Sequence, residues 1–276
     1  MEGVMNEARS RGFVERSVPE GYDRFMARQL FEPWGRELVA RAGLEAGMSV
    51  LDVASGPGVV ARLAAAAVGP DGRVVASDIS PSMLAIAAAK PEEPGSAPIE
   101  FRECSASALE AEPSSFDRVL CQHGLQFFPD RERAVDEIHR VLVDGGLAAV
   151  STWAAEHPVG LFGEMAETLR ECDVAEPYPR AFDMASYALA APELAALFRG
   201  AGFRDVVVDT VELECVWETL DDAVATVTGT PFAPIVAALP DEGKERVRTR
   251  LAERLGGVGD GAVCLRTASN LACGIK

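Results

Sequence analysis

Basic side chains are scarce in this chain of 276 residues, which has 26 lysines and arginines against 43 aspartates and glutamates. The formal net charge is −17, and the isoelectric point is about 4.6. DNA, RNA and anionic membrane surfaces are bound through clustered lysine and arginine, because phosphate contacts dominate the affinity. The composition therefore predicts no nucleic-acid partner. A large net negative charge is also typical of a protein whose charge keeps it soluble.

Long apolar runs, a secretion signal and paired cysteines are also missing from the sequence. There is no run of about 18 apolar residues of the kind that spans a membrane, and residues 1–7 lack the apolar core of a signal peptide. The six cysteines include no CxxC pair, and the three histidines share no spacing that suits zinc. We therefore expect a cytoplasmic protein with reduced cysteines, no membrane insertion and no metal site.

The sequence does contain one dense motif, in residues 50–61 (VLDVASGPGVVA). An apolar strand precedes a turn with two glycines, and an alanine-rich helix follows. Asp78 directly follows a second predicted strand, residues 74–77. Glycines let a ligand approach the main chain, and a carboxylate at the next strand tip can hold both ribose hydroxyls. Gly56, Gly58 and Asp78 therefore predict a nucleoside site.

Two kinds of nucleoside ligand fit this motif. Gly56, Gly58 and Ala61 also match a dinucleotide fingerprint, so a nicotinamide cofactor remains an alternative. Pro57, however, has no N–H to offer a pyrophosphate, and Asp52 puts a carboxylate where a phosphate would lie. The sulfonium and ammonium groups of S-adenosylmethionine suit Asp52 better, so the turn favours that ligand.

Four further segments follow the motif, namely residues 78–84 (DISPSML), 99–103 (IEFRE), 115–122 (SFDRVLCQ) and 140–147 (RVLVDGGL). In this order and spacing they resemble the class I S-adenosylmethionine-dependent methyltransferases, in particular the small-molecule branch that includes enzymes of the ubiquinone/menaquinone-biosynthesis type. The resemblance covers roughly residues 20–218 and the last strand. It implies an α/β fold with a Rossmann-like, seven-stranded, mostly parallel sheet, helices on both faces, and S-adenosyl-L-methionine as cofactor. The last strand, residues 263–275, would insert antiparallel between its neighbours.

The domain organisation follows from where the alternation of strands and helices breaks. We expect residues 1–40 to form an N-terminal helical segment, and residues 41–218 and 260–276 to form the Rossmann-like core. Within it, residues 154–190 interrupt the pattern, and residues 219–259 are predicted to be a helical insertion. Ligands bind at the carboxyl ends of the strands in open α/β sheets, so we expect these two insertions to form a cap over the substrate.

The resemblance also assigns the cofactor contacts. Adenine would lie between Ile79 and Met83, whose alternative role is ordinary core packing. After the third strand the family often carries an aspartate that accepts a hydrogen bond from the adenine amino group, whereas this chain has Ser105, a weaker neutral acceptor. Gln122 would hold the methionine end of the cofactor. The predicted cofactor residues are Asp52, Ala54, Gly56, Gly58, Asp78, Ile79, Met83, Ser105, Ala106 and Gln122.

The acceptor side is less well defined. His123 is the predicted candidate for a general base, and a structural role in the turn is the alternative. Gln126 and Phe127 resemble the family's substrate-facing patch, although core packing would also account for the phenylalanine. Tyr22 and His157 complete the predicted substrate-side residues.

Methyl transfer to a small, largely apolar metabolite is the predicted reaction. The sulfonium is already a good leaving group, so the protein mainly has to exclude water and align the nucleophile, the methyl carbon and the sulfur. A general base is needed only where the acceptor must lose a proton. Two alternatives stay open, because a fold does not fix a function: a non-methylating cyclisation or isomerisation with the cofactor bound, and a non-catalytic nucleoside-binding partner of another enzyme.

Overall fold

The structure is a computed structural model that describes residues 23, 26–154, 160–174, 188–226, 233–256 and 261–276. The chain divides into two compact units. The core unit comprises residues 32–155, 188–211 and 269–276, and the second unit comprises residues 1–31, 156–187 and 212–268. The predicted substrate-side residues Tyr22 and His157 lie outside the described residues.

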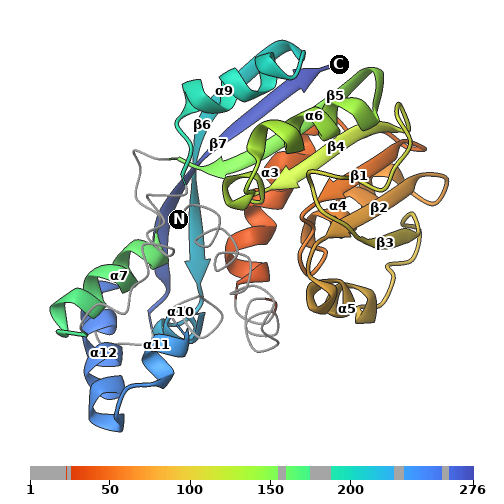
Figure 1. Ribbon diagram of the computed structural model, residues 1–276. Helices are drawn as coiled ribbons and strands as arrows, with labels where there is room; N and C mark the ends of the chain where they lie inside the picture. Colours follow the sequence, from red (N-terminus) through yellow and green to blue (C-terminus); the bar gives the residue numbers. More distant parts are fainter. Residues whose placement is uncertain (1–22, 24–25, 155–159, 175–187, 227–232, 257–260) are drawn as a thin grey trace. The chain divides into compact units, whose positions relative to one another are not determined.

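A seven-stranded sheet with the spatial order β3-β2-β1-β4-β5-β7-β6 organises the fold (Figure 1). Its strands are β1 (Ser49–Val53), β2 (Arg73–Asp78), β3 (Ile99–Glu103), β4 (Phe116–Gln122), β5 (Leu142–Trp153), β6 (Arg204–Trp217) and β7 (Val263–Ile275). Strands β1 to β5 pair in parallel, whereas β7 runs antiparallel to β5, with Leu147 opposite Ile275 and Trp153 opposite Ser269. The predicted Rossmann-like sheet with an inserted antiparallel last strand is confirmed.

The strand order reverses at β1, which pairs with β2 on one side and with β4 on the other. In open α/β sheets, ligands bind in the crevice outside the carboxyl ends of the strands at such a switch point. β1 and β2 are buried along most of their length, as inner parallel strands covered on both faces must be. We therefore expect the ligand-binding residues to follow β1, β2 and β4.

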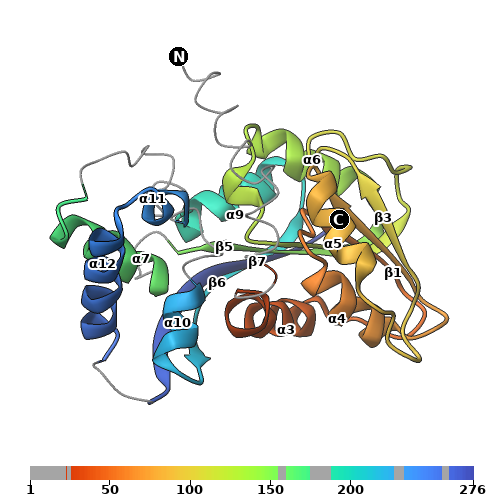
Figure 2. The same cartoon turned by 90° about the horizontal axis from the view of Figure 1, so that it is seen from below.

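Helices cover both faces of the sheet in the core unit. Figure 2 shows α3 (Glu32–Ala42) and α4 (Val59–Val68) on one face, and α6 (Arg131–Val141) and α9 (Ala191–Gly200) on the other. Two shorter elements, α5 (Pro81–Ala89) and the 3₁₀ turn η2 (Leu125–Phe127), follow β2 and β4. Helix α3 falls in the core unit, and its Trp34 and Leu38 side chains are fully buried.

Helix α6 shows how the sequence specifies these elements. Asp130 precedes the helix, and its side chain accepts a hydrogen bond of 2.9 Å from the Arg133 N–H, which satisfies one of the unpaired donors of the first turn. The residues that pack into the core recur at helical spacing, as an amphipathic surface helix requires. They are Ala134, Val135, Ile138 and Val141.

The second unit contains η1 (Ala27–Phe31), α7 (Leu161–Glu171), α10 (Leu220–Thr226), α11 (Ala233–Ala237) and α12 (Asp241–Arg254). Helices α7 and α12 pack together, and Arg254 pairs with Glu164 at 2.8 Å and with Glu171 at 2.7 Å. Partly exposed ion pairs contribute little to stability, whereas burial of apolar side chains such as Met165 of α7 and Leu251 of α12 contributes more. Among the described residues, no helix has the length and apolar character needed to cross a membrane.

Candidate functional site

The turn after β1 is the first part of the candidate site. Ala54, Gly56 and Gly58 all have positive φ angles, of 56°, 53° and 81°. This backbone conformation is uncommon and strained for alanine, and it is freely available to glycine. A Cβ atom added at Gly56 would meet no other atom within 4 Å, so a ligand can approach the main chain there. A Cβ at Gly58 would lie 3.1 Å from Ala87 Cβ, which shows that Gly58 lets the turn pack on α5.

Asp78, at the end of β2, faces this turn. Its Oδ2 accepts a hydrogen bond from the Gly56 N–H and its Oδ1 accepts one from the Ser80 N–H, both at 2.8 Å. Each carboxylate oxygen can accept a further hydrogen bond, which is what two ribose hydroxyls would supply. Burial raises the pKa of Asp78, and the two N–H donors oppose that shift. Ser80, not Asp78, caps α5, because Ser80 Oγ accepts a 3.4 Å hydrogen bond from the Met83 N–H.

Asp52, inside β1, is a buried carboxylate without a hydrogen-bond partner. The residue is 1% exposed, and neither Oδ1 nor Oδ2 accepts a hydrogen bond. Burial raises the pKa of Asp52 well above its usual range, and the negative charge of Asp78 raises it further. The nearby Ala61 N–H lowers this pKa in part, although it does not form a hydrogen bond with the carboxylate. A buried carboxylate is costly unless it is paired. The position therefore suits the cationic group of a ligand.

The carboxyl ends of β1 and β4 come together beside α3. A Cβ atom added at Gly124 would lie only 2.7 Å from Ala54 Cβ, and a Cβ added at Gly35 of α3 would lie 3.0 Å from Gln122 Oε1. Two residues without side chains thus let α3 and the two strand ends approach each other around Gln122. This places the Gln122 amide at the switch point of the sheet.

His123, which follows β4, is packed among aromatic rings. Its ring stacks on Trp153 with centroids 3.9 Å apart, and it meets the Trp34 ring edge-on at 5.8 Å. Its Nε2 lies 2.8 Å from Ser269 Oγ. Burial lowers the pKa of His123 to about 3, so the imidazole is neutral at pH 7. A group with so low a pKa is a weak general base, and the φ angle of 51° adds local strain.

The predicted adenine residues Ile79 and Met83 lie in different environments. Ile79 is 59% exposed, whereas Met83 is 4% exposed and belongs to the buried face of α5. The exposed isoleucine directly follows Asp78, so it presents an apolar surface beside the carboxylate that would hold the ribose. Ile79 can therefore cover a planar base, whereas Met83 is buried in the core.

The loop after β3 carries Ser105 and Ala106. The Cys104 N–H donates a 3.1 Å hydrogen bond to the Asp78 carbonyl oxygen, which holds the start of this loop against the end of β2. Ser105 Oγ accepts a 3.2 Å hydrogen bond from the Ser107 N–H. A hydroxyl oxygen has two acceptor positions and one proton, so Ser105 keeps one acceptor position and its O–H for a ligand.

On the acceptor side, Gln126 in η2 is almost fully buried, at 1% exposed. Its Oε1 accepts a 2.8 Å hydrogen bond from the Trp153 N–H, which fixes the orientation of the amide. The other end of the amide, Nε2, is buried and has no hydrogen-bond partner. An unsatisfied buried donor costs free energy, so an oxygen acceptor that reached Nε2 would be bound favourably. Phe127, beside it, is half-buried.

Sequence reasoning missed three residues that shape this region, namely Glu137, Trp153 and Ser269. A signal existed for Glu137, since a carboxylate three residues after Ala134 and one before Ile138 falls on the buried side of α6. Trp153 and Ser269 meet His123 only through tertiary contacts. Within the described residues, no cluster of three or more histidine, cysteine or acidic side chains could hold a metal ion.

Comparison with known proteins agrees with this geometry. Residues 50–146 match the model of a methyltransferase domain. The ubiquinone/menaquinone biosynthesis C-methyltransferase of Hahella chejuensis is 37% identical over 134 residues, which cover 47% of this chain and 54% of that protein. The chain spans about half the length of the curated relatives it matches.

Solved structures share the fold over most of the chain. A putative methyltransferase of Bacillus halodurans superposes with a TM-score of 0.56 at 21% identity, over 88% of this chain and 98% of the other. Phosphoethanolamine N-methyltransferase 2 of Haemonchus contortus, in complex with S-adenosyl-L-methionine, gives a TM-score of 0.58 at 18% identity, over 94% of this chain and 60% of the other. At these identities the likeness shows the fold.

Proposed function

This chain belongs to the class I S-adenosylmethionine-dependent methyltransferases, and we propose that it transfers the methyl group of its cofactor to a small, largely apolar metabolite. The cofactor is S-adenosyl-L-methionine. Bound at the switch point, it supplies a methyl group on a cationic sulfur that is a good leaving group.

One observation carries the proposal most directly, namely the unpaired buried carboxylate of Asp52 next to the glycine turn. A pyrophosphate would bring a second negative charge to this position, which Coulomb repulsion disfavours. The ammonium and sulfonium groups of S-adenosylmethionine bring positive charge, so Asp52 gains a partner on binding. Pro57 supports the same choice, because it removes a backbone donor that a pyrophosphate would use.

The other cofactor contacts follow from the positions of the side chains. The open main chain at Gly56 lets the cofactor approach closely, while Ala54 and Gly58 shape the turn around it. Asp78 binds the ribose hydroxyls through its two remaining acceptor positions.

The remaining cofactor residues divide between the two ends of the ligand. Ile79 and Met83 cover the adenine, whose amino edge meets Ser105 and Ala106. Gln122 holds the amino-acid end.

On the acceptor side, Gln126 would donate from Nε2 to an oxygen of the substrate, and Phe127 would cover an apolar part of it. We also propose Tyr22 and His157 as residues on the substrate side. His123 keeps its neutral ring stacked on Trp153, so it shapes the site instead of removing a proton. The protein's contribution to catalysis is then the exclusion of water and in-line alignment of the reacting atoms.

The small, largely apolar acceptor is supported by the relative from Hahella chejuensis, whose name places it in ubiquinone and menaquinone biosynthesis. The acidic composition supports the absence of a nucleic-acid substrate, because the excess of carboxylates over basic side chains repels phosphates.

Calorimetry on the full chain tests the proposal. We expect S-adenosylmethionine and S-adenosylhomocysteine to bind and NAD not to bind. Tighter binding of NAD than of either ligand would contradict the proposal. A screen of small phenols and quinols with methyl-labelled cofactor then tests transfer; cofactor that binds but is never consumed would favour a non-methylating role.

A further inference from the structure

Glu137 of α6 is, with Asp52, one of two carboxylate residues that are buried in the described part of the chain. Its side chain is 4% exposed, and both of its oxygens accept hydrogen bonds. Oε1 accepts from Arg140 Nε at 2.8 Å and from Arg133 Nη2 at 3.2 Å, and Oε2 accepts from Arg140 Nη2 at 2.8 Å. The hydrogen bonds from Arg140 are the main reason that the pKa of Glu137 lies below its usual range. The carboxylate therefore stays charged at neutral pH.

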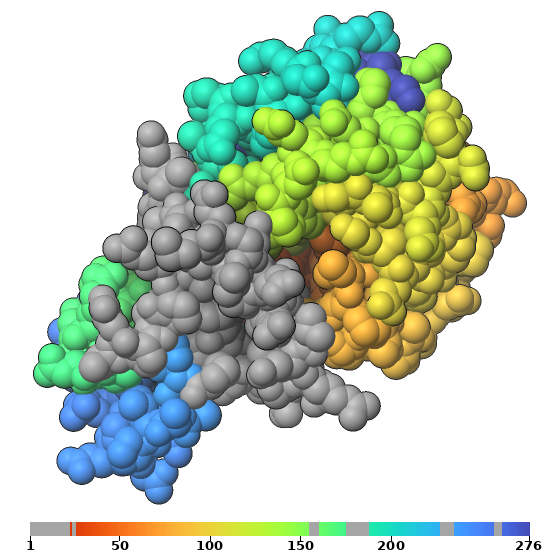
Figure 3. Space-filling model, in the orientation of Figure 1, coloured from red at the N-terminus to blue at the C-terminus, as the bar shows by residue number. Residues whose placement is uncertain are grey.

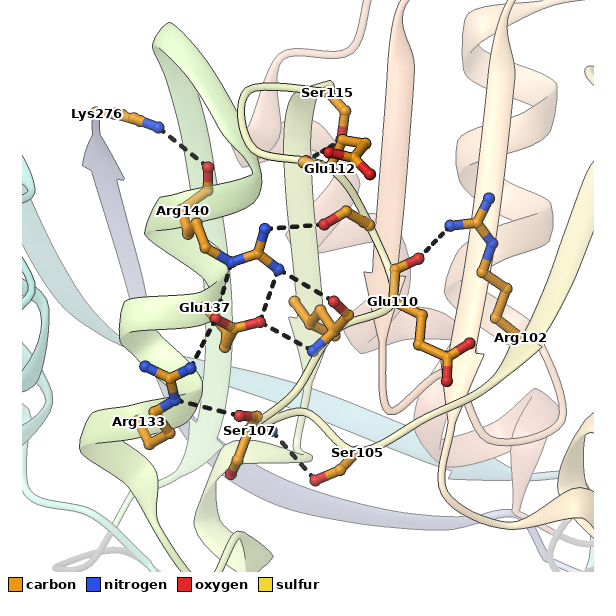
Figure 4. Close-up of polar contacts among 12 residues, drawn as sticks. Arg102, Ser105, Ser107, Glu110, Glu112, Ser115, Arg133, Glu137, Arg140 and Lys276 are labelled. Atoms are coloured by element: carbon orange, nitrogen blue, oxygen red, sulfur yellow. Dashed lines mark hydrogen bonds and ion pairs between the residues drawn. The ribbon is translucent and has the colours of Figure 1, made fainter.

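The same cluster reaches the loop that joins β3 to β4 (Figure 4). The Leu109 N–H donates to Glu137 Oε2 at 3.0 Å, and Arg140 donates to the carbonyl oxygens of Leu109 at 3.0 Å and of Ala111 at 2.8 Å. Arg133 Nε donates to the Ser107 carbonyl oxygen at 3.3 Å. Glu137 thus holds both guanidinium groups in the orientation in which they bind the loop.

Core packing of Leu109 and these polar contacts together hold the loop. Residues 104–115 form no helix or strand apart from an isolated bridge between Ser105 and Ala108. In Figure 3 the loop, drawn in yellow, lies directly against the light green α6. Its first part is bound to β2 through the hydrogen bond from the Cys104 N–H to the Asp78 carbonyl oxygen. The cluster on α6 fixes the loop from the other side.

We propose that Glu137 is a positioning residue for adenine recognition: through Arg133 and Arg140 it sets the place of Ser105 and Ala106 relative to Asp78. The inference rests on the proposed function, because it takes the cofactor's adenine to lie against this loop. A contact runs from the cluster to Ser105 itself, since Arg133 binds the Ser107 carbonyl oxygen and the Ser107 N–H binds Ser105 Oγ. A shift of the loop away from α6 would therefore move the hydroxyl group that faces the adenine amino edge.

Two ligands separate this role from general stabilisation. S-adenosylhomocysteine carries the adenine amino group, whereas its 6-deamino purine analogue carries a hydrogen atom in its place and offers Ser105 no hydrogen bond. We expect the wild-type protein to prefer the first ligand. In Glu137→Ala, affinity for S-adenosylhomocysteine should fall about tenfold while affinity for the purine analogue changes little, so the preference shrinks. Glu137→Gln keeps an oxygen that can accept the Leu109 N–H, so it should retain an intermediate preference.

The matched control is Ile138→Val, which removes one methylene from the neighbouring core residue on the same helix and leaves the hydrogen bonds of Glu137, Arg133 and Arg140 to the loop in place. It should lower the unfolding temperature without changing the ratio of the two dissociation constants. An unchanged ratio in Glu137→Ala, or in Glu137→Gln if the alanine variant does not fold, would overturn the inference, and so would a wild-type protein that binds both ligands equally. Failure of the wild-type protein to bind S-adenosylhomocysteine at all would instead contradict the proposed function.

Discussion

The backbone N–H of Gly56 donates a 2.8 Å hydrogen bond to Oδ2 of Asp78. This bond joins the glycine turn after β1 directly to the carboxylate at the end of β2. The two elements that would hold the cofactor's ribose are therefore linked by a contact within the chain itself.

Asp78→Ala tests the ribose contact. The variant removes two charge-assisted hydrogen bonds to the ligand, each of which contributes roughly 1.5–3 kcal/mol, and it leaves the Gly56 N–H without its acceptor. Affinity for S-adenosylhomocysteine, measured by calorimetry, should fall at least about tenfold. The control is Asp71→Asn, at the exposed turn before the opposite end of β2, which should leave affinity unchanged. An unchanged dissociation constant for Asp78→Ala would mean that other groups bind the ribose.

Asp52→Asn should make the free protein more stable and bind its cofactor more weakly. The buried carboxylate has no partner, so replacing it with a neutral group of the same shape removes a cost of folding. In a domain of this size, relief of about 1 kcal/mol raises the unfolding temperature by roughly 2–4 °C. Thermal unfolding at pH 7 checks the first effect, and calorimetry with S-adenosylmethionine checks the second.

Glu137→Gln provides the contrast for that experiment. The chemical change is the same, from a buried carboxylate to an amide, but here it breaks ion pairs with Arg133 and Arg140. We expect this variant to lower the unfolding temperature, because the amide no longer neutralises the two guanidinium groups and its NH2 group faces one of their donors inside the fold. A fall in the unfolding temperature of Asp52→Asn as well would show that the Asp52 carboxylate has a stabilising partner after all.

Cofactor binding should release a proton from Asp52. Burial raises the pKa of this group in the free protein, and a bound cation favours the ionised form and lowers that pKa. The free protein therefore holds the proton more tightly than the complex does, so affinity should rise with pH between the two pKa values and level off above the higher one. Calorimetry of S-adenosylmethionine binding in two buffers of different ionisation enthalpy measures the released proton. The dependence should disappear in Asp52→Asn.

His123 should not titrate between pH 5 and 8. Burial lowers its pKa to about 3, which keeps the ring neutral across this range. The chain has only three histidines, so nuclear magnetic resonance can follow each imidazole ring, and His123→Asn assigns the signal. Asparagine is a suitable replacement because it tolerates the positive φ angle at this position. A His123 signal that titrates near pH 6.5 would restore the histidine as a candidate general base.

Local patterns in the sequence determined the frame of this protein. Gly56 and Gly58 lie between an apolar strand and an alanine-rich helix, and this pattern predicts a tight turn with positive φ angles. The same pattern of strand, turn and helix predicts that Asp78 lies at the end of the next strand. The order of the remaining segments predicted the mostly parallel sheet and the antiparallel β7, which the structure confirms.

The tertiary structure decided how far each buried acid is paired. Asp52 has no hydrogen bond, which its place in a strand does not reveal. Glu137 has Arg133 and Arg140 within one helical turn, which the sequence shows, but its hydrogen bond from the Leu109 N–H, 28 positions away, forms only in the fold. His123 owes its low pKa and its stacking to burial beside Trp153 and Ser269, the latter 146 positions away. Periodicity and turn chemistry report on neighbours along the chain, whereas desolvation and pairing depend on groups that meet only after folding.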